Sequence, residues 1–560
     1  MIPDRREMTM NTRLRSQNVF QFSSLAGGLI CAILAWQATT VVCVAQPATK
    51  PVPGIEKTGS SYRLLVDGSP YLMLSGQVHN SDTSNLDDLN RSLDVLANWH
   101  ANTAEVPIYW EAIEPAEGQF DFSSVDMAIQ AARKRDLHLV LLWFGTWKNG
   151  ESHYVSEWMK RDKQKYTRVR GARGEEMEII SPLCRSAMEG DARAFAALLH
   201  HVKSVDEGER TVLMVQVENE PGLFGTDRDY SEAASELFGQ PVPKELLSFI
   251  ESHRQQLSAP MAEEWNRSPK SGNWKQVFGQ LAPEAFSAWL IADYVNTVAS
   301  AGKHEYPLPM YANVWLIEGE ERAGRWPSGG ATLNVLDVWK AAAPAIDILA
   351  PDIYYPKFYD VAAQYTRPDN PLFVPETNFN PYFIPFAYTA FGNFNAIGFS
   401  PFGIDDVANG GPAAAIGAGF EDTYRVLRPL LPLIARYQYT GKLHPVLQGL
   451  GNGEDWKMSI RVGDRLAANV NFTAAFDPAK GRAGGIIIEL APDDFVVMGT
   501  GFDVTFRELE GPLRDAEIIS IEEGTFEGQR WMPSRRLNGD EFHVSLPTDR
   551  SKILRVRVAR

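Results

Sequence analysis

Cysteine is scarce in this chain, with three residues in a sequence of 560. Cys31 and Cys43 fall in an N-terminal segment that has the features of an export signal, so only Cys184 is expected in the mature protein. A single cysteine excludes an intrachain disulfide, and stability must then come from a large apolar core. We interpret Cys184 as a small buried hydrophobic residue rather than a nucleophile.

Positive charge is also lacking. The net charge is −16, and no cluster of Lys or Arg stands out beyond the N-terminus. Nucleic acid and anionic membrane surfaces are therefore excluded as expected partners. His, Cys and Asp show no metal-site spacing, and no dinucleotide, phosphate-loop or nucleophile-elbow motif follows a predicted strand. We predict no cofactor and no obligatory metal.

The N-terminus has the order of features that is typical of a secretory signal. Four arginines come first, namely Arg5, Arg6, Arg13 and Arg15. An apolar stretch at 25–36 follows, and the small residues near Ala45 are suitable for cleavage of the signal. We predict a signal peptide over 1–45 and an exported protein, in the periplasm or outside the cell. The apolar stretch is short for a membrane span, so no stable insertion is expected after cleavage; an uncleaved anchor is the alternative.

A Pro-rich linker is predicted at 46–58, and a hairpin at 62–74. In the region from 59 to 440, short apolar runs alternate with longer amphipathic stretches. The runs predict strands at 71–78, 103–109, 137–144, 211–217, 309–315, 346–354, 372–374 and 396–401. Helices are predicted at 86–99, 125–135, 187–202, 283–301, 335–343, 361–365 and 420–437. This alternation favours an α/β fold of the (β/α)8 TIM barrel type over an open sheet. Residues 227–275 interrupt it, and we predict an insertion over the barrel mouth or its side.

The pattern changes beyond residue 440. Short strands are separated by turns that contain Gly, Pro or Asp, which is typical of an antiparallel sandwich. The predicted strands cover 458–462, 465–472, 485–490, 495–498, 502–509, 516–523, 541–546 and 553–558. We therefore predict a C-terminal all-β sandwich domain over 441–560, with a structural role.

Two predicted barrel strands end in carboxylates. The fourth leads into Glu218-Asn219-Glu220-Pro221, and the seventh leads into Glu376. All strand C-termini of a barrel ring one mouth, so these carboxylates can face each other. Two carboxylates about 5–5.5 Å apart are what double-displacement glycoside cleavage requires. Strand alternation does not choose between Glu218 and Glu220, because residues two apart point to the same side.

Three segments carry a resemblance to a known family. The strand-four segment 215–220 (VQVENE) is similar to the acid/base motif of glycoside hydrolase family 35, the β-galactosidases of the retaining (β/α)8 clan. Residues 75–79 (SGQVH) resemble its first-strand motif. Trp110 with 114–122 (EPAEGQFDF) resembles its second-strand loop. The resemblance covers about residues 60–440.

The resemblance implies roles for individual residues. Glu220 becomes the acid/base and Glu376 the nucleophile. Asn219 would hold the sugar 2-hydroxyl, and Glu218 would support the site.

Departures from the family pattern indicate a divergent bacterial branch. Ile113 stands where the family has His before Glu-Pro, and Asn80 stands where it has Tyr. The family's Ala-Glu-Trp, whose Glu contacts galactose, is replaced by Gly145-Thr146-Trp147. Glu111 is a candidate for the lost carboxylate, with an outward salt bridge as the alternative.

Aromatic residues at predicted strand ends form a second set of candidates, because rings can stack on the apolar face of a sugar. They are Trp110, Trp143, Trp147, Trp315, Tyr354 and Tyr355. Packing at the rim is the alternative. One tyrosine after strand six is expected to hydrogen-bond the nucleophile, as in related barrels, and we favour Tyr355. Asn313 and Asp405 are further polar candidates, while His79 is interpreted as a core histidine.

The predicted function is that of an exported, exo-acting retaining β-galactosidase that hydrolyses terminal β-D-galactosides from oligosaccharides, such as plant xyloglucan fragments. An endo-β-glucanase or mannanase of the same clan is one alternative, and a non-catalytic sugar-binding barrel is another. An insertion at 227–275 that blocked the cleft would favour exo action. The sequence leaves the oligomeric state open.

Overall fold

The computed structural model describes residues 50–319, 322–449, 456–475, 481–510 and 514–559. The predicted signal peptide at 1–45 lies outside these residues. The described chain begins with a small antiparallel sheet of β1 (Gly54–Thr58), β2 (Ser61–Val66) and β3 (Ser69–Tyr71). Residues 54–58 were expected in the linker, but they pair with β2 as a strand. Alternate residues of β2 are buried, so one face of this sheet packs against the core.

Eight parallel strands form a closed ring. They are β4 (Met73–Leu74), β5 (Thr103–Tyr109), β6 (His138–Lys148), β9 (Val212–Asn219), β10 (Met310–Trp315), β11 (Ile348–Asp352), β12 (Val374–Thr377) and β13 (Gly398–Pro401). Five pair side by side from β5 to β11, and β12, β13 and β4 form a second group. Parallel bridges Gln77–Glu105 and Ile353–Thr377 join the two groups. The predicted α/β class is confirmed.

The inside of the ring is filled by alternate side chains of its strands. Val140, Leu142, Met214 and Ile348 belong to one buried apolar cluster. Leu64 of β2 belongs to the same cluster, so the small N-terminal sheet closes this end of the ring. Side chains of opposite parity pack outward against the helices. A functional site is therefore expected at the other end of the ring, where the parallel strands end.

Helices follow the strands along the chain and cover the ring from outside. They are α1 (Leu86–Asn98), α3 (Ser123–Arg133), α5 (Arg185–Asp206), α10 (Ala282–Glu305), α11 (Leu336–Ala342), α12 (Phe358–Tyr365), α13 (Phe386–Gly392), α14 (Gly411–Leu427) and α15 (Leu431–Tyr437). In α1 the side chain of Asn85 caps the N-terminus by accepting from the backbone N–H of Asp87 at 2.8 Å. Leu89, Leu93 and Leu96 then face the core.

One predicted helix is divided in the structure. Residues 420–437 were expected to be continuous, but α14 ends at Leu427 and α15 begins at Leu431, with a 3-10 turn between them. Pro429 and Pro432 explain the division, because neither has an N–H for the helical ladder.

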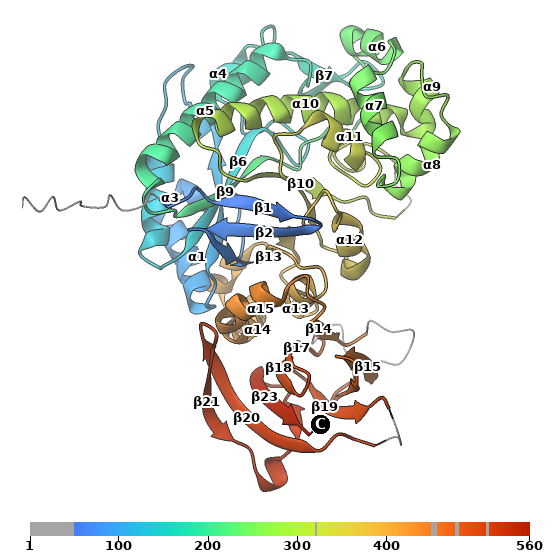
Figure 1. Cartoon of the computed structure of the whole chain (residues 1–560). Helices are drawn as coiled ribbons and strands as arrows, with labels where there is room; N and C mark the ends of the chain where they lie inside the picture. The colour runs from blue at the N-terminus through green and yellow to red at the C-terminus, as the bar shows by residue number, and fades with distance from the viewer. Residues whose placement is uncertain (1–49, 320–321, 450–455, 476–480, 511–513, 560) are drawn as a thin grey trace, which may run out of the picture. The chain divides into compact units, whose positions relative to one another are not determined.

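The insertion at 227–275 lies against the helix layer. It holds α6 (Glu232–Gly239), α7 (Lys244–Ser252), α8 (Ala259–Arg267) and the start of α9 (Trp274–Phe278). The rings of Phe238 and Trp274 contact Phe286 of α10 with centroids 5.3 and 5.4 Å apart. The insertion therefore packs at the side of the ring (Figure 1).

Residues beyond 440 form two antiparallel sheets. The larger has the order β14 (Leu443–Leu447), β17 (Gly484–Ala491), β18 (Asp494–Thr500), β23 (Lys552–Val558), β20 (Ile518–Glu527) and β21 (Arg530–Arg536). The smaller has the order β15 (Lys457–Val462), β16 (Leu466–Phe472), β19 (Phe502–Glu508) and β22 (Val544–Leu546). Val470, Val497 and Phe506 belong to one apolar cluster that both sheets share.

The larger sheet is buried on both faces near its centre. Ile487 points into the cluster between the two sheets, whereas Ile486 and Ile488 join the cluster that contains the helices around the ring. This double burial explains why β17 reads as a continuous apolar run rather than an alternating one.

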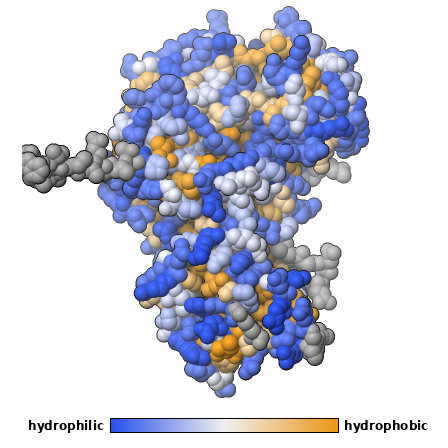
Figure 2. Space-filling view, viewed as in Figure 1, coloured by the Kyte–Doolittle hydropathy of each residue, from blue (hydrophilic) through white to orange (hydrophobic). Residues whose placement is uncertain are grey.

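The described surface is mostly polar. On the face shown in Figure 2, hydrophilic residues predominate and apolar residues occur between them in separate groups. No helix among the described residues is both long enough and apolar enough to cross a bilayer.

Candidate active site

A cavity of about 450 Å³ opens where the parallel strands end. Its lining residues follow β4, β6, β9, β10, β11, β12 and β13, or lie at the ends of these strands. They are Asn80, Lys148, Asn149, Glu220, Trp315, Leu316, Glu318, Asp352, Tyr354, Tyr355, Glu376 and Phe402. No residue of 227–275 is among them, so the insertion does not wall this cavity.

Glu376, on β12, is 5% exposed and is surrounded by hydrogen-bond donors. Its Oε1 accepts from Gln77 Nε2 at 2.9 Å, and its Oε2 accepts from the hydroxyl of Tyr354 at 2.7 Å. The amides of Asn219 and Asn313 lie 3.5 Å from Oε1. These donors stabilise a negative charge on Glu376 and fix its orientation.

Glu220 faces the same cavity and is 6% exposed. Its Oε2 accepts from Asn149 Nδ2 at 2.5 Å, and its backbone N–H donates to Asn313 Oδ1 at 2.7 Å. Burial and the nearby charge of Glu376 raise the pKa of Glu220 to about 7. An oxygen of Glu220 lies within 4.8 Å of an oxygen of Glu376. A carboxyl group that is about half protonated at neutral pH thus lies beside a second carboxyl that is surrounded by hydrogen-bond donors.

Glu218 points away from the cavity although it is two residues from Glu220. Both glutamates have left-handed backbones, with φ of 63° at Glu218 and 44° at Glu220. The strand alternation that would make them equivalent has therefore ended. Oε2 of Glu218 accepts from the backbone N–H of Trp147 at 2.6 Å. Burial and the neighbouring carboxyl of Asp191 raise its pKa well above the usual range.

Asn219, between the two glutamates, connects three polar groups. Its Oδ1 accepts from Lys148 Nζ at 2.9 Å, and its Nδ2 is 3.5 Å from Glu376. The side chain therefore joins the end of β6 to the carboxylate on β12.

Three of the aromatic predictions are wrong. Trp110, Trp143 and Trp147 are fully buried and do not line the cavity. Trp143 donates from Nε1 to Asp191 at 2.8 Å and lies beside Trp110. For Trp143 and Trp147 the reason is the length of β6, which runs on to Lys148 instead of ending at residue 144. Trp143 therefore lies inside the strand, with no free ring face.

Trp315 and Tyr355 do line the cavity, as expected for residues that contact a ligand. Trp315 stacks on Phe224 with ring centroids 5.7 Å apart. The preference for Tyr355 as partner of the nucleophile is wrong, because Tyr354 makes that contact. The Tyr355 hydroxyl instead donates to the carbonyl of Leu316 at 3.4 Å.

The remaining predicted residues, Glu111, His79 and Asp405, are not among those that line the cavity. Glu111 is exposed and pairs with Lys160 at 2.9 Å, which is the outward salt bridge of the alternative interpretation. His79 is partly exposed, and its Nδ1 lies 2.8 Å from Oδ2 of Asp405. That hydrogen bond raises the pKa of His79. Asp405 thus anchors the segment after β4 instead of entering the cavity.

Sequence reasoning missed Gln77, Lys148, Asn149 and Asp352 as site residues, and it placed Asn313 only as a candidate. Asn313 proves central, because its Nδ2 also donates to Asp352 Oδ2 at 2.9 Å. A signal for Asp352 was present, since it is a carboxylate at the end of a predicted strand, like Glu376.

Oxygens of Glu220, Asp352 and Glu376 all lie within 4.8 Å of one another, a spacing that could suit a cation. Both oxygens of Glu376 and Oδ2 of Asp352 already accept hydrogen bonds from side chains. The ammonium group of Lys148 also lines the cavity. A cation would have to displace these donors, so we assign no metal to this group.

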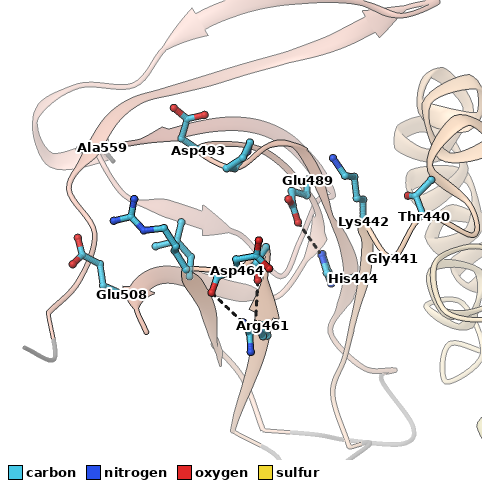
Figure 3. Close-up of a pocket in the computed structure, with 14 residues that line it drawn as sticks. Thr440, Gly441, Lys442, His444, Arg461, Asp464, Glu489, Asp493, Glu508 and Ala559 are labelled. Carbon is cyan, nitrogen blue, oxygen red and sulfur yellow. Dashed lines mark hydrogen bonds and ion pairs between the residues drawn. The ribbon is translucent and has the colours of Figure 1, made fainter. Parts of the chain in front are cut away.

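A larger cavity of about 640 Å³ lies in the C-terminal sheets (Figure 3). Charged side chains of both signs line it, including Lys442, Arg461, Asp464 and Glu508. Its most buried pair is His444 with Glu489, and His444 Nε2 lies 3.8 Å from Glu489 Oε2. No Phe, Tyr or Trp is among its described lining residues, and these include no close pair of buried carboxylates. The smaller cavity at the strand ends is therefore the candidate active site.

A ring of parallel strands with two buried carboxylates at one mouth fits one class of enzyme in particular, the glycoside hydrolases. Residues 63–271 match the description "Glycosyl hydrolases family 35". Over this segment the chain is similar to the family that the sequence motifs indicated. Residues 420–546 match a domain of unknown function, DUF5597.

Individual proteins show the same similarity. A β-galactosidase of Xanthomonas manihotis is 24% identical over 204 residues, which are 35% of this chain and 31% of that protein. The chain thus spans about a third of the length of this relative. Among solved structures, a β-galactosidase from Bacillus circulans sp. alkalophilus has a TM-score of 0.45 at 16% identity, covering 65% of this chain and 57% of that one. The β-galactosidase of the haloarchaeon Halorubrum lacusprofundi has a TM-score of 0.43 at 15% identity, covering 63% and 58%.

Proposed function

We propose that the protein is an exo-acting, retaining β-galactosidase with Glu376 as nucleophile and Glu220 as acid/base. The observation that carries the proposal is the buried pair itself. Glu376 accepts hydrogen bonds from two close donors, while the pKa of Glu220 is raised to about 7. In this proposal the ring is a (β/α)8 barrel over 59–440, and the two C-terminal sheets are a sandwich domain over 441–560.

The two carboxyls divide the chemistry between two steps. In the first, Glu376 attacks the anomeric carbon, and Glu220 gives its proton to the leaving glycosidic oxygen. A glycosyl ester on Glu376 results. In the second, Glu220 takes a proton from water, the water oxygen attacks the same carbon, and the bond to Glu376 breaks. Two inversions leave the sugar with its original configuration.

The substrate part of the proposal comes from the similarity to this family and from the relative named β-galactosidase. The cavity, at about 450 Å³, is in the lower half of the range of small-molecule sites, which supports binding at a chain end rather than along a polymer. We extend the proposal to export into the periplasm and to oligosaccharides such as xyloglucan fragments. An endo-acting clan enzyme would require a longer groove.

A panel of aryl β-glycosides tests the substrate. We expect hydrolysis of the β-galactoside at least about tenfold faster, in kcat/KM, than of the β-glucoside and β-mannoside. The first sugar released should be the β-anomer, which proton NMR detects before mutarotation. Cleavage of only the β-glucoside or β-mannoside would overturn the galactoside assignment. Sugar binding by calorimetry without any cleavage would support the non-catalytic alternative.

The two adjacent tyrosines provide a matched pair of variants. Tyr354→Phe removes the donor to Glu376, and loss of a hydrogen bond to a charged group should lower kcat about 10–100-fold. Tyr355→Phe leaves Glu376 untouched and should change kcat less than about threefold. Steady-state kinetics on the preferred aryl glycoside measures both. A larger loss in Tyr355→Phe would reinstate the assignment made from the sequence.

A further inference from the structure

Asp352, at the end of β11, is a third carboxyl in the cavity and has no role in the two-step chemistry above. It is 2% exposed, and one of its oxygens lies within 4.8 Å of oxygens of both Glu220 and Glu376. Among the described residues that line the cavity, Lys148 is the only cation. Three negative charges and one positive charge at this depth are unfavourable, so the group must retain a proton.

The contacts of Asn313 show which oxygen of Asp352 carries a hydrogen. The backbone N–H of Glu220 can only donate, and it donates to Asn313 Oδ1 at 2.7 Å. The other end of the amide is therefore Nδ2, which donates to Asp352 Oδ2 at 2.9 Å. Because Oδ2 is an acceptor, the hydrogen of a neutral Asp352 belongs on Oδ1. Oδ1 is buried and receives no hydrogen from any residue that the structure describes.

We propose that Asp352 is a positioning residue that stays neutral and donates its Oδ1 hydrogen to the Glu220 carboxylate. The inference rests on the proposed role of Glu220 as acid/base. Such a donor stabilises the ionised form of Glu220, which is the form that must accept a proton from water in the second step. Together with Asn149, it also holds the Glu220 carboxyl in place.

The charges around Asp352 agree with this assignment. Glu220 faces it from the end of β9, Glu376 from β12 and Lys148 from the end of β6. Burial, with the charges of Glu376 and Glu220, raises the pKa of Asp352 well above the usual range, and Lys148 opposes the rise. The hydrogen bond acts in the opposite direction on Glu220 and lowers its pKa.

Two variants with side chains of similar size test whether the side chain at position 352 acts as a hydrogen-bond donor or as a negative charge. Asp352→Asn keeps a donor, because its amide oxygen can accept from Asn313 while its NH2 points to Glu220. Asp352→Leu has no donor. Wild-type kcat/KM should fall above about pH 7, where Glu220 loses its proton. We expect this alkaline limb to stay near pH 7 in Asp352→Asn and to move up by about one pH unit in Asp352→Leu, because Glu220 loses a hydrogen bond to its anion.

The direction of the shift decides the outcome. If Asp352 were ionised, both variants would remove a negative charge beside Glu220, and both limbs would move to lower pH. That result, or an equal upward shift in both variants, would overturn the proposal. The profiles are measured on the aryl glycoside that the wild type cleaves best.

A second measurement needs neither substrate nor the leucine variant, so it separates this proposal from the proposed function. The full chain is labelled with ¹³C-aspartate, and its infrared spectrum at neutral pH is compared with that of Asp352→Asn. We expect the difference to contain the carbonyl band of a neutral ¹³C-carboxyl group. A difference that contains only carboxylate bands would show that Asp352 is ionised, whichever glycosides the enzyme cleaves. Thermal unfolding of both proteins checks that the variant is folded.

Discussion

Glu376→Gly is expected to lower kcat by roughly 10⁴–10⁶-fold, because removal of a nucleophile leaves only binding and charge stabilisation by the remaining groups. Among the described carboxylates that line the cavity, Glu376 alone receives both a hydroxyl and an amide hydrogen bond at less than 3 Å, so none of these neighbours is oriented to replace it. KM should change far less than kcat. Steady-state rates on an aryl β-galactoside measure the loss.

Rescue of Glu376→Gly by azide gives a second measurement, the configuration of the glycosyl azide that forms. Azide can enter the space that the side chain leaves and displace the aryl group once, from the face opposite the leaving group. The expected product is therefore the α-glycosyl azide, identified by NMR. Glu111→Gln is the control, since that carboxylate is exposed and paired with Lys160. Turnover near the wild-type level in Glu376→Gly would show that the nucleophile is misassigned.

Glu220→Ala should lose about 10²–10⁴-fold in kcat on substrates whose leaving group needs a proton, and much less on a dinitrophenyl glycoside. On the activated substrate the glycosyl ester should accumulate, because no base activates water. Azide needs no base, so it should restore turnover and yield the β-glycosyl azide. The configuration of the azide thus distinguishes the two carboxyls.

The same variant tests the pH dependence. Burial and Glu376 raise the pKa of Glu220 to about 7, and the protonated form delivers the first proton. Wild-type kcat/KM should therefore decline as pH rises through 7, by about tenfold per unit. In Glu220→Ala the decline should disappear for the dinitrophenyl substrate. An unchanged alkaline limb, or no effect of azide, would assign the proton donor to another group.

Much of the strand order was predictable because parallel strands buried on both faces read as uninterrupted apolar runs. Residues 103–109 were predicted with the observed bounds of β5. No such run marks β21 (Arg530–Arg536), an edge strand of the larger sheet in which most side chains are exposed and three are arginines. β14 (Leu443–Leu447) was missed for a different reason, because Pro445 is unusual in a strand.

The site was predictable where a local motif marked it and not where distant segments meet. Glu220 and Glu376 were found through strand ends and family resemblance. The ring brings Lys148 to Asn219 and Asn313 to Asp352, and no local pattern encodes either contact. Glu218 likewise points away from the cavity because its backbone is left-handed, and the alternation of side chains along a strand does not predict this conformation.

Those two left-handed glutamates set a limit on how the protein can be engineered. A non-glycine residue in this conformation costs about 1–3 kcal/mol, and glycine or asparagine adopts it more cheaply. Directed evolution for heat tolerance alone would therefore favour such replacements at Glu218 and Glu220. Replacement of Glu220 would stabilise the protein but remove its proton donor. Selection for heat tolerance should therefore be combined with selection for turnover.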